Sequence, residues 1–345
     1  MPSPVVAVVI PCYRVRSAVL RVIAAVPGFV RFIICVDDCC PEESGAHISA
    51  KVVDPRVRVF HNDVNLGVGG ATIRGFQEAL ALGADIVVKI DGDGQMDPEL
   101  LPRFISPIIN GKADYVKGNR FTSIESVRQM PALRLFGNSV LSLLCKLSSG
   151  YWHLFDPNNG YICCHADVLK RLPLNKIARR YFFESDMLFR LGVARALVLD
   201  VPMAAVYGDE QSSLRIGRVA LPFLFSHIRN FGKRMLYRYF ILDFNIASVE
   251  LLCGLALLAF GCLVGGVGWY DSIRDGVTAS AGTVMLAALP FITGMQLLIS
   301  AINFDVTDVI REPLHRLIAT QDQEELFAPA APPAKTPVDP PARVR

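Results

Sequence analysis

Several features that would point directly to a function are missing from this sequence of 345 residues. Lys and Arg together number 35 against 32 Asp and Glu, and the resulting net charge of +3 is too small to favour nucleic acid as a partner. Glycines 67, 69 and 70 form neither a Walker loop nor a Gly-x-Gly-x-x-Gly fingerprint after a strand, so we interpret them as the flexible start of a helix. The amino terminus lacks a basic region followed by a cleavage site, and we therefore expect no signal peptide.

Paired Cys-x-x-Cys spacing is also absent, although the chain has nine cysteines. They occur singly or as the adjacent pairs Cys39-Cys40 and Cys163-Cys164. This spacing disfavours a zinc site built from Cys35, Cys39 and Cys40. Reduced, buried thiols in a cytosolic domain are the better interpretation.

Long apolar runs are scarce before residue 240 and frequent after it, and they account for a hydrophobic content of 52%. The segments from Ile246 to about Trp269 and from about Val277 to Phe304 are each long enough to cross a bilayer. Gly254, Gly261 and Gly265 would let two such helices pack closely, and the same small residues are compatible with a homo-oligomer.

Basic residues lie outside this pair of apolar segments. The stretch Gly217–Phe240 is rich in Lys, Arg and aromatic residues, which is typical of an interfacial helix that contacts anionic membrane lipids. The loop expected at Tyr270–Asp275 has a single Arg, whereas Arg311 and Arg316 follow the second segment. By the positive-inside rule, both ends of the chain lie in the cytoplasm, and we expect an integral protein of the cytoplasmic membrane with two transmembrane helices.

The first part of the chain alternates strand-like and helix-like segments. Val5–Ile10, Phe32–Val36 and Ile86–Ile90 are apolar runs typical of buried parallel strands, and Arg56–His61 alternates like a strand nearer an edge. Helices are expected between them over 17–25 and 65–82. The spacing predicts an α/β fold with a mostly parallel, Rossmann-like sheet and right-handed crossovers.

These patterns divide the chain into four parts. We expect an α/β domain over 1–215, an interfacial amphipathic segment over 216–243 and a two-helix transmembrane hairpin over 244–306. The remaining part, 307–345, would be cytoplasmic and would end in a disordered tail that is rich in Pro and Ala.

Acidic residues follow one of the buried strands directly. Asp91-Gly92-Asp93 comes at its end, with Gln95 and Asp97 close behind. The glycine favours a turn that aims both carboxylates at one hard cation, and Mg²⁺ or Mn²⁺ takes one or two carboxylates together with phosphate oxygens. Open α/β sheets bind ligands at the carboxyl ends of their strands. The alternative is a solvated turn in which Asp97 caps the following helix.

Other polar residues occupy similar places. Arg120 follows the expected strand Ala113–Lys117 and could pair with a diphosphate, as could any surface arginine. Glu184 and Asp186 open a helix, where the helix dipole favours acidic residues even without a catalytic role.

Taken in order, the motifs of residues 5–215 resemble those of family 2 glycosyltransferases of the GT-A fold. Within that family, the subgroup that glycosylates polyprenyl or dolichyl phosphate is the most similar. Its members combine this domain with juxtamembrane amphipathic helices, and some add transmembrane helices at the carboxyl end. The motifs are Val9-Ile10-Pro11-Cys12-Tyr13, Val36-Asp37-Asp38, Asn65-Leu66-Gly67-Val68-Gly69, Asp91-Gly92-Asp93-Gly94-Gln95 and Gly118-Asn119-Arg120.

The resemblance implies a role for each matching residue. Asp91, Asp93 and Gln95 would hold Mg²⁺ or Mn²⁺, and Asp156 falls at a turn near the acceptor. Ser213 stands where the subgroup has a phosphate-gripping lysine, which leaves Arg215 or Arg218 to hold the acceptor phosphate. A UDP- or GDP-sugar would be bound by Pro11, Tyr13, Val36, Asp38, Asp91, Gly92, Asp93 and Arg120.

Three functions remain open at this stage. The first, implied by the resemblance, is inverting transfer of a hexose to polyprenyl (undecaprenyl) phosphate, whose ionised oxygen needs no base. The second is transfer to a hydroxyl of a lipid-linked glycan during assembly of a cell-surface polysaccharide, for which Asp186 or Glu184 would be the base. The third is a non-catalytic membrane protein that binds a nucleotide, which the carboxylates at 91 and 93 make less favoured.

Overall fold

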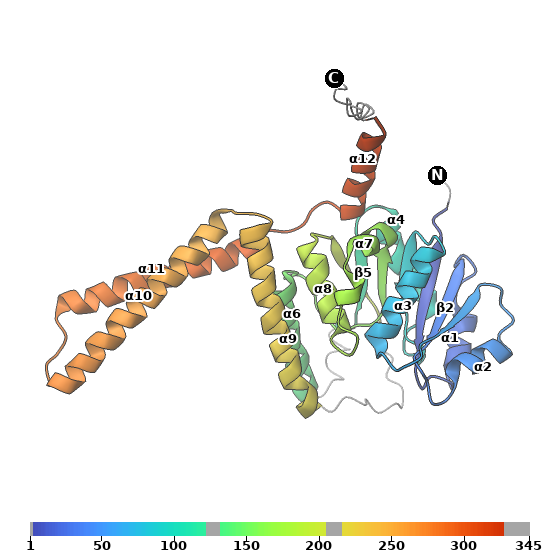
Figure 1. Ribbon diagram of the computed structural model, residues 1–345, viewed down its shortest axis with the longest axis horizontal. Helices are drawn as coiled ribbons and strands as arrows, with labels where there is room; N and C mark the ends of the chain where they lie inside the picture. Colours follow the sequence, from blue (N-terminus) through green and yellow to red (C-terminus); the bar gives the residue numbers. More distant parts are fainter. Residues whose placement is uncertain (1–2, 122–131, 205–215, 328–345) are drawn as a thin grey trace, which may run out of the picture.

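The computed structural model describes residues 3–121, 132–204 and 216–327, and its first part is built on a seven-stranded sheet with the order β3-β2-β1-β4-β6-β5-β7 (Figure 1). The strands are β1 (Val6–Cys12), β2 (Phe32–Asp37), β3 (Val57–His61), β4 (Ile86–Lys89), β5 (Tyr115–Asn119), β6 (Ile162–His165) and β7 (Val198–Pro202). The α/β class and the mostly parallel sheet are therefore confirmed, as is the place of β3 at an edge.

Among the described strands, β6 alone runs antiparallel to its neighbours, β4 and β5. Its register pairs Ile162 with Lys89 and His165 with Ile86. The amino-terminal end of β6 therefore lies beside the carboxyl end of β4. As a result, the turn at residues 156–161, which precedes β6, lies next to the turn at residues 91–97, which follows β4 and is called the acidic turn below.

Helices cover both faces of the sheet, and successive residues of each strand point to opposite faces. In β1, Val8 and Ile10 face one apolar cluster, and Ala7 and Val9 face the other. The first cluster includes side chains of α1 (Val19–Ala25), α2 (Ser44–Lys51) and α4 (Leu101–Ile109). The second includes side chains of α3 (Val68–Ala81), α6 (Ala132–Ser149), α7 (Ala166–Arg171) and α8 (Phe183–Val193).

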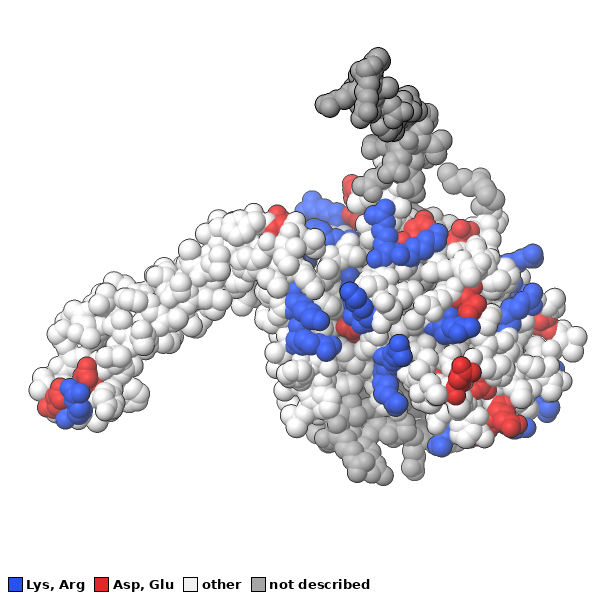
Figure 2. All heavy atoms as spheres, viewed as in Figure 1, with Lys and Arg blue, Asp and Glu red and all other residues white. Residues whose placement is uncertain are grey.

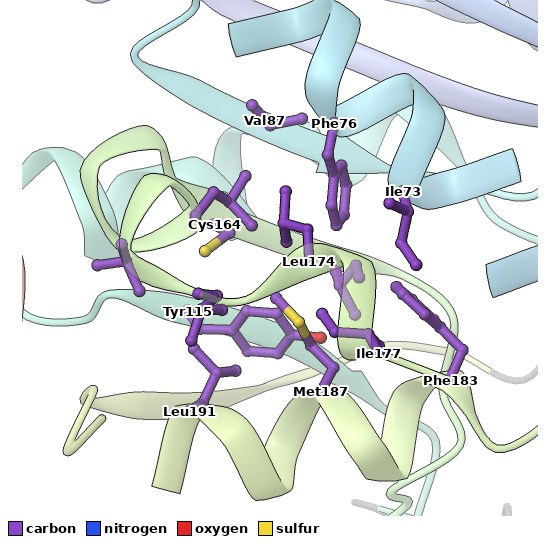
Figure 3. Close-up of a cluster of buried hydrophobic side chains, with 14 of the residues drawn as sticks. Ile73, Phe76, Val87, Tyr115, Cys164, Leu174, Ile177, Phe183, Met187 and Leu191 are labelled. Carbon is purple, nitrogen blue, oxygen red and sulfur yellow. The ribbon is translucent and has the colours of Figure 1, made fainter. Parts of the chain in front are cut away.

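Figure 3 shows part of the second cluster. Phe76 of α3 and Phe183 of α8 approach each other with ring centroids 6.4 Å apart, and Met187 lies beside Tyr115 of the sheet. All nine cysteines are free thiols; six of them are buried in the domain, as predicted, whereas Cys39, Cys253 and Cys262 are exposed.

The carboxyl-terminal part begins with α9 (Ile216–Leu236), which packs along α6, and continues through a π-helical turn (Tyr237–Ile241). Two long helices, α10 (Ile246–Asp275) and α11 (Ala281–Thr307), then form a hairpin that extends away from the sheet (Figure 1). Both are long and apolar enough to cross a membrane. On the face shown in Figure 2, the hairpin carries charged side chains only at its free end and near its base.

Small residues hold the hairpin together. A Cβ atom on Gly261 would lie 2.8 Å from backbone atoms of α11, so glycine is needed there for close approach of the two helices, as predicted. A Cβ atom on Gly254 would lie 3.0 Å from Leu298 of α11, whereas one on Gly265 would make an ordinary contact of 3.4 Å, so glycine is not required at 265. The expected loop at residues 270–275 is wrong, because those residues form the last turns of α10. Their polar side chains extend the helix beyond its apolar part, and Gly276, with a φ of 66°, ends it.

The helix α12 (Leu314–Phe327) was not expected from the sequence, and it returns the chain to the α/β domain. Its first turn lies on the buried carboxylate of Asp114, which accepts hydrogen bonds from the backbone N–H groups of Leu314 (2.6 Å) and His315 (2.8 Å). The His315 ring also contacts Asp114 through Nδ1 (2.7 Å) and stacks on His165 with ring centroids 4.3 Å apart.

Candidate active site

The acidic turn lies at the carboxyl end of β4, near the middle of the sheet. Asp91 and Asp93 are partly exposed there, and Asp93 Oδ1 accepts a hydrogen bond from the backbone N–H of Gln95 (2.9 Å). Asp97 caps the short helix that follows by accepting from the backbone N–H of Glu99 (2.9 Å). The sequence left open whether Asp97 caps the following helix, and the structure shows that it does.

A buried lysine underlies this turn. Lys89, the last residue of β4, is 1% exposed, and its Nζ lies 2.7 Å from Asp91 Oδ1 and 3.6 Å from Glu184 Oε1. Burial alone would lower the pKa of Lys89, but the carboxylates of Asp91 and Glu184 outweigh it, so the pKa is raised and the ammonium stays charged. Lys89 was not predicted as a site residue, although a lysine inside an otherwise apolar strand is a signal that could have identified it.

Gly160, at the end of the turn before β6, is equally close to this group. A Cβ atom at that position would lie 2.4 Å from Lys89 Nζ and 2.7 Å from Asp91 Oδ2. Only glycine leaves room for the ion pair between Lys89 and Asp91. The antiparallel entry of β6 thus makes Gly160 part of the site.

The oxygen atoms of the acidic turn fit a hard divalent cation. Asp91 and Asp93 offer carboxylates at a partly exposed strand end, and Gln95 lies in the same turn. Within the described ranges, no three His, Cys, Asp or Glu side chains gather closely enough to enclose a metal by themselves. Such a donor set suits Mg²⁺ or Mn²⁺ when phosphate oxygens of a ligand complete the coordination shell.

The residues expected to bind the nucleotide lie at the ends of β1 and β2. Tyr13 follows β1 and is 42% exposed, whereas Pro11 and Val36 are buried within the strands. The carboxylate of Asp38 is also buried and accepts hydrogen bonds from the backbone N–H groups of Leu66 (2.9 Å) and Gly67 (2.7 Å). In this structure Asp38 therefore orders the start of α3, and its role as a nucleotide ligand stays a prediction.

Arg120 and Asp156, which the sequence predicted separately, form one ion pair. Arg120 Nε and one terminal nitrogen each donate to an oxygen of Asp156 at 2.8 Å. Burial would raise the pKa of Asp156, but the hydrogen bonds and charge of Arg120 hold it below its usual value. Because Asp156 is 5% exposed and the Arg120 side chain 33% exposed, the carboxylate orients a guanidinium that is accessible from solvent.

The turn that carries Asp156 is anchored from below by a second buried lysine. Lys117 of β5 is 1% exposed; its Nζ donates to the carbonyl oxygens of Gly118 (3.2 Å) and Asp156 (3.1 Å) and pairs with Asp200 (2.8 Å). Lys117 was placed in a strand by the sequence but not assigned to the site.

Glu184 and Asp186 have different surroundings although both lie in the first turn of α8. Glu184 lies 3.6 Å from the Lys89 ammonium, which is closer to Asp91. Burial raises the pKa of Glu184, and the charge of Lys89 offsets this effect only in part. Asp186 Oδ1 accepts from Asn230 Nδ2 (2.8 Å), and Oδ2 accepts from the backbone N–H of Ala178 (2.9 Å) and pairs with Arg190 (3.3 Å). Of the two carboxylates, only Glu184 is at the acidic turn.

Of the two arginines expected to hold the acceptor phosphate, one belongs to a described helix and the other does not. Arg215 and the stretch 209–214 lie outside the described residues. Arg218 belongs to the first turn of α9.

Comparison with known proteins gives consistent results. Residues 7–177 match Glycosyl transferase family 2. The chain is 32% identical over 176 residues to the undecaprenyl-phosphate mannosyltransferase of Micrococcus luteus, a match that covers 50% of this chain and 71% of that protein. It is 30% identical over 209 residues to the polyprenol monophosphomannose synthase of Mycolicibacterium smegmatis, covering 59% and 77%.

A third relative is matched over a smaller share of its length. This is the UDP-N-acetylglucosamine–dolichyl-phosphate N-acetylglucosaminyltransferase of Methanococcus voltae, which is 34% identical over 154 residues, covering 45% of this chain and 61% of that protein. Among solved structures, glucosyl-3-phosphoglycerate synthase from Mycobacterium tuberculosis, in complex with Mn²⁺, UDP-glucose and phosphoglyceric acid, has a TM-score of 0.50 at 20% identity and covers 65% of this chain and 80% of that one. This likeness confirms the GT-A fold.

Proposed function

The chain belongs to glycosyl transferase family 2, and on that premise we propose that it transfers a hexose from a nucleotide-sugar to polyprenyl phosphate in the membrane. The observation that carries the proposal is the attachment of two bilayer-length apolar helices to the GT-A domain through α9. The three relatives named above have polyprenyl- or dolichyl-phosphate sugar transfer in their names. We place the acceptor in the bilayer for these two reasons.

The outer surface of the domain next to the hairpin supports this arrangement. Figure 1 shows α6 and α9 side by side at the base of the hairpin, and the two helices pack together. Apolar side chains at helical spacing are exposed on both, which is typical of helices that lie in the headgroup region of a membrane. They are Phe136, Val140 and Leu143 of α6 and Leu221, Leu224, Phe225 and Ile228 of α9.

We assign the donor to the acidic turn and the neighbouring strand ends. Asp91, Asp93 and Gln95 would hold Mg²⁺ or Mn²⁺, which would stabilise the charge that develops on the departing nucleoside diphosphate. Lys89 fixes the orientation of Asp91 from below through their 2.7 Å contact. Tyr13 is exposed where the base and ribose would lie.

Arg120 has the chemistry to hold the phosphate end of a substrate. Its guanidinium is kept in one orientation by both oxygens of Asp156, and a planar guanidinium binds phosphate well. A lipid phosphate is ionised at neutral pH, so it can attack the anomeric carbon without a base. Attack opposite the leaving group then inverts the configuration.

The test is transfer of label from nucleotide-sugar to lipid. Purified full-length protein in nanodiscs is incubated with undecaprenyl phosphate, Mn²⁺ and a panel of labelled UDP- and GDP-sugars. We expect labelled lipid with at least one donor, and a chain that labels no lipid with any donor would end the proposal. Asp93→Asn should abolish transfer, while Asp97→Asn, in the same turn, should retain it because asparagine caps a helix equally well.

One observation favours a second candidate, transfer to a hydroxyl of a lipid-linked glycan. A hydroxyl acceptor needs a carboxylate base near the reacting sugar, and Glu184 lies at the acidic turn with a raised pKa. The same panel of donors, offered with a lipid-linked sugar in place of the lipid phosphate, separates the two candidates.

A further inference from the structure

A buried carboxylate near the end of the second apolar helix joins the hairpin to the domain. Asp305 of α11 is 5% exposed, and Arg234 of α9 contacts both of its oxygens, at 2.7 and 3.0 Å. Trp152 Nε1 (2.8 Å) and the Tyr239 hydroxyl also donate to it. Arg234 is itself 1% exposed and donates to the carbonyl oxygen of Leu147 near the end of α6 (3.0 Å). Residues of α6, α9, the π-helical turn and α11, together with Trp152 of the segment after α6, therefore meet at one charge pair.

One turn earlier, α9 makes a second buried polar contact with the domain. Asn230 precedes Arg234 by four residues, so both side chains lie on the same face of the helix. Asn230 Nδ2 donates to Asp186 Oδ1 (2.8 Å), and these two residues are 1% and 2% exposed. The face of α9 that carries Arg234 is thus fastened to the first turn of α8 as well as to α11.

The first turn of α8 also contacts both sides of the active site. Glu184 lies 3.6 Å from Lys89, beneath the acidic turn. The next residue, Ser185, donates to Asn158 Oδ1 (3.2 Å), within the turn that carries Asp156. Three consecutive residues of α8 therefore contact Lys89 beneath the acidic turn, the Asp156 turn and the helix that leads into the hairpin.

From these contacts we propose that Asn230, Arg234 and Asp305 are positioning residues for transfer to an acceptor embedded in the bilayer. This inference rests on the proposed function. The membrane fixes the depth at which the acceptor phosphate lies, whereas the α/β domain fixes the position of the nucleotide-sugar donor. Their alignment depends on the angle at which the hairpin leaves the domain, and the two α9 contacts set that angle. A misplacement of about 1 Å at a reacting centre can cost on the order of 100-fold in rate.

The test compares a membrane-embedded and a water-soluble acceptor in variants that replace the buried polar side chains by apolar ones. Arg234→Met with Asp305→Leu replaces the ion pair by apolar side chains of similar size, a change that buried pairs can tolerate. It also removes the acceptor of Trp152 Nε1 and of the Tyr239 hydroxyl, so thermal unfolding is measured first to show that the variant is folded. Asn230→Leu removes the second contact alone. We expect each variant to lose about tenfold or more in kcat with undecaprenyl phosphate in nanodiscs. With water-soluble citronellyl phosphate, kcat and the donor KM should stay within about twofold of the unaltered protein, since a freely diffusing acceptor needs no alignment with the bilayer.

The control is Ser300→Ala, which removes the 2.8 Å hydrogen bond from Ser300 to Glu250 within the hairpin and leaves both α9 contacts intact. It should behave like the unaltered protein with either acceptor. Equal losses with both acceptors in the Arg234→Met, Asp305→Leu protein would show a general structural role and overturn the proposal. Unchanged transfer to undecaprenyl phosphate would overturn it as well.

A distance measurement tests the same contacts without relying on transfer. Spin labels are attached to Cys262 in the hairpin and to Lys51→Cys at the end of α2, after the other exposed cysteines, Cys39 and Cys253, are replaced by serine. In nanodiscs we expect a narrow distance distribution that broadens in the Arg234→Met, Asp305→Leu variant. Equal widths would refute the positioning role. If the unaltered protein transfers nothing to lipid but the widths differ as expected, the proposed function fails and the positioning contacts stand.

Discussion

Replacement of Asp186 by Asn separates a structural carboxylate from a catalytic base. Asp186 is 2% exposed, and its oxygens accept hydrogen bonds from Asn230 and from the backbone N–H of Ala178 and pair with Arg190. An asparagine has a single acceptor oxygen. If that oxygen keeps the bond to Asn230, the new amide NH₂ faces the N–H group of Ala178 and the guanidinium of Arg190, which are both donors.

The cost can be worked out from these contacts. A hydrogen bond to a charged group contributes about 1.5–3 kcal/mol, and the bond from Ala178 and both bonds from Arg190 are lost on the Oδ2 side. The contact with Arg190 counts for less, because it is 3.3 Å long and that side chain is 16% exposed. We therefore expect Asp186→Asn to lower the free energy of unfolding by about 2–4 kcal/mol. For a domain of this size, the apparent Tm should fall by about 4–16 °C, at roughly 2–4 °C per kcal/mol.

Transfer by the folded molecules should fall by less than about tenfold, because Asp186 is not at the acidic turn, whereas loss of a general base costs about 100- to 10,000-fold. Thermal unfolding in detergent gives the Tm, and kcat is measured well below it. Glu184→Gln is the matched comparison, two residues earlier in α8 and next to Lys89 beneath the acidic turn. An Asp186→Asn protein with an unchanged Tm and a 100-fold loss of kcat would refute the structural role and support a hydroxyl acceptor.

Three further outcomes are expected. Burial lowers the pKa of His227, whose Nδ1 contacts Ser148 Oγ (2.8 Å), to about 4. The imidazole is therefore neutral in the folded state, and its contribution to the free energy of unfolding is complete above about pH 6.5. In urea unfolding, that contribution of about 3 kcal/mol should be lost as the pH falls from 6.5 to 4, and His227→Gln should abolish this loss. Gly160→Ala should raise the donor KM by about 10- to 100-fold, since its Cβ would displace Lys89, and an unchanged KM would contradict this. EDTA should abolish transfer until Mn²⁺ is restored, and calorimetry should show weaker Mn²⁺ binding to Asp91→Asn; activity that survives EDTA would contradict the metal assignment.

Most strands were predictable because a buried strand leaves a run of apolar residues, but β7 was not predicted from the sequence. The direction of β6 was not predictable in this way. Apolar residues at Ile162, Cys163 and Cys164 read the same for either direction, and the direction depends on how α6 and the following turn return the chain to the sheet. That reversal is what brings Gly160 to Asp91, so the missing strand direction also hid a site residue.

Residues of the candidate site were predictable only where they directly follow a strand. Asp91 and Asp93 follow a strand directly, and their position pointed to the site. The pairing of Arg120 with Asp156 joins residues 36 positions apart and required the fold. Such pairs are invisible to a local pattern because neither partner differs from an ordinary surface residue in its own segment.

The buried cations follow a rule that would have recovered some of this information. Lys89, Lys117 and Arg234 are all within 1% of full burial, and an unpaired charge at such depth would be strongly destabilising. Each of them must therefore meet a carboxylate, and each has one that comes from another segment, although the nearest carboxylate to Lys89 is that of Asp91 in its own segment. A cation inside an apolar strand or on the inner face of a helix thus predicts a long-range contact, even though it does not name the partner. The partners found here are Glu184 for Lys89, Asp200 for Lys117 and Asp305 for Arg234, and these three pairs connect the acidic turn, the Asp156 turn and the hairpin to the rest of the domain.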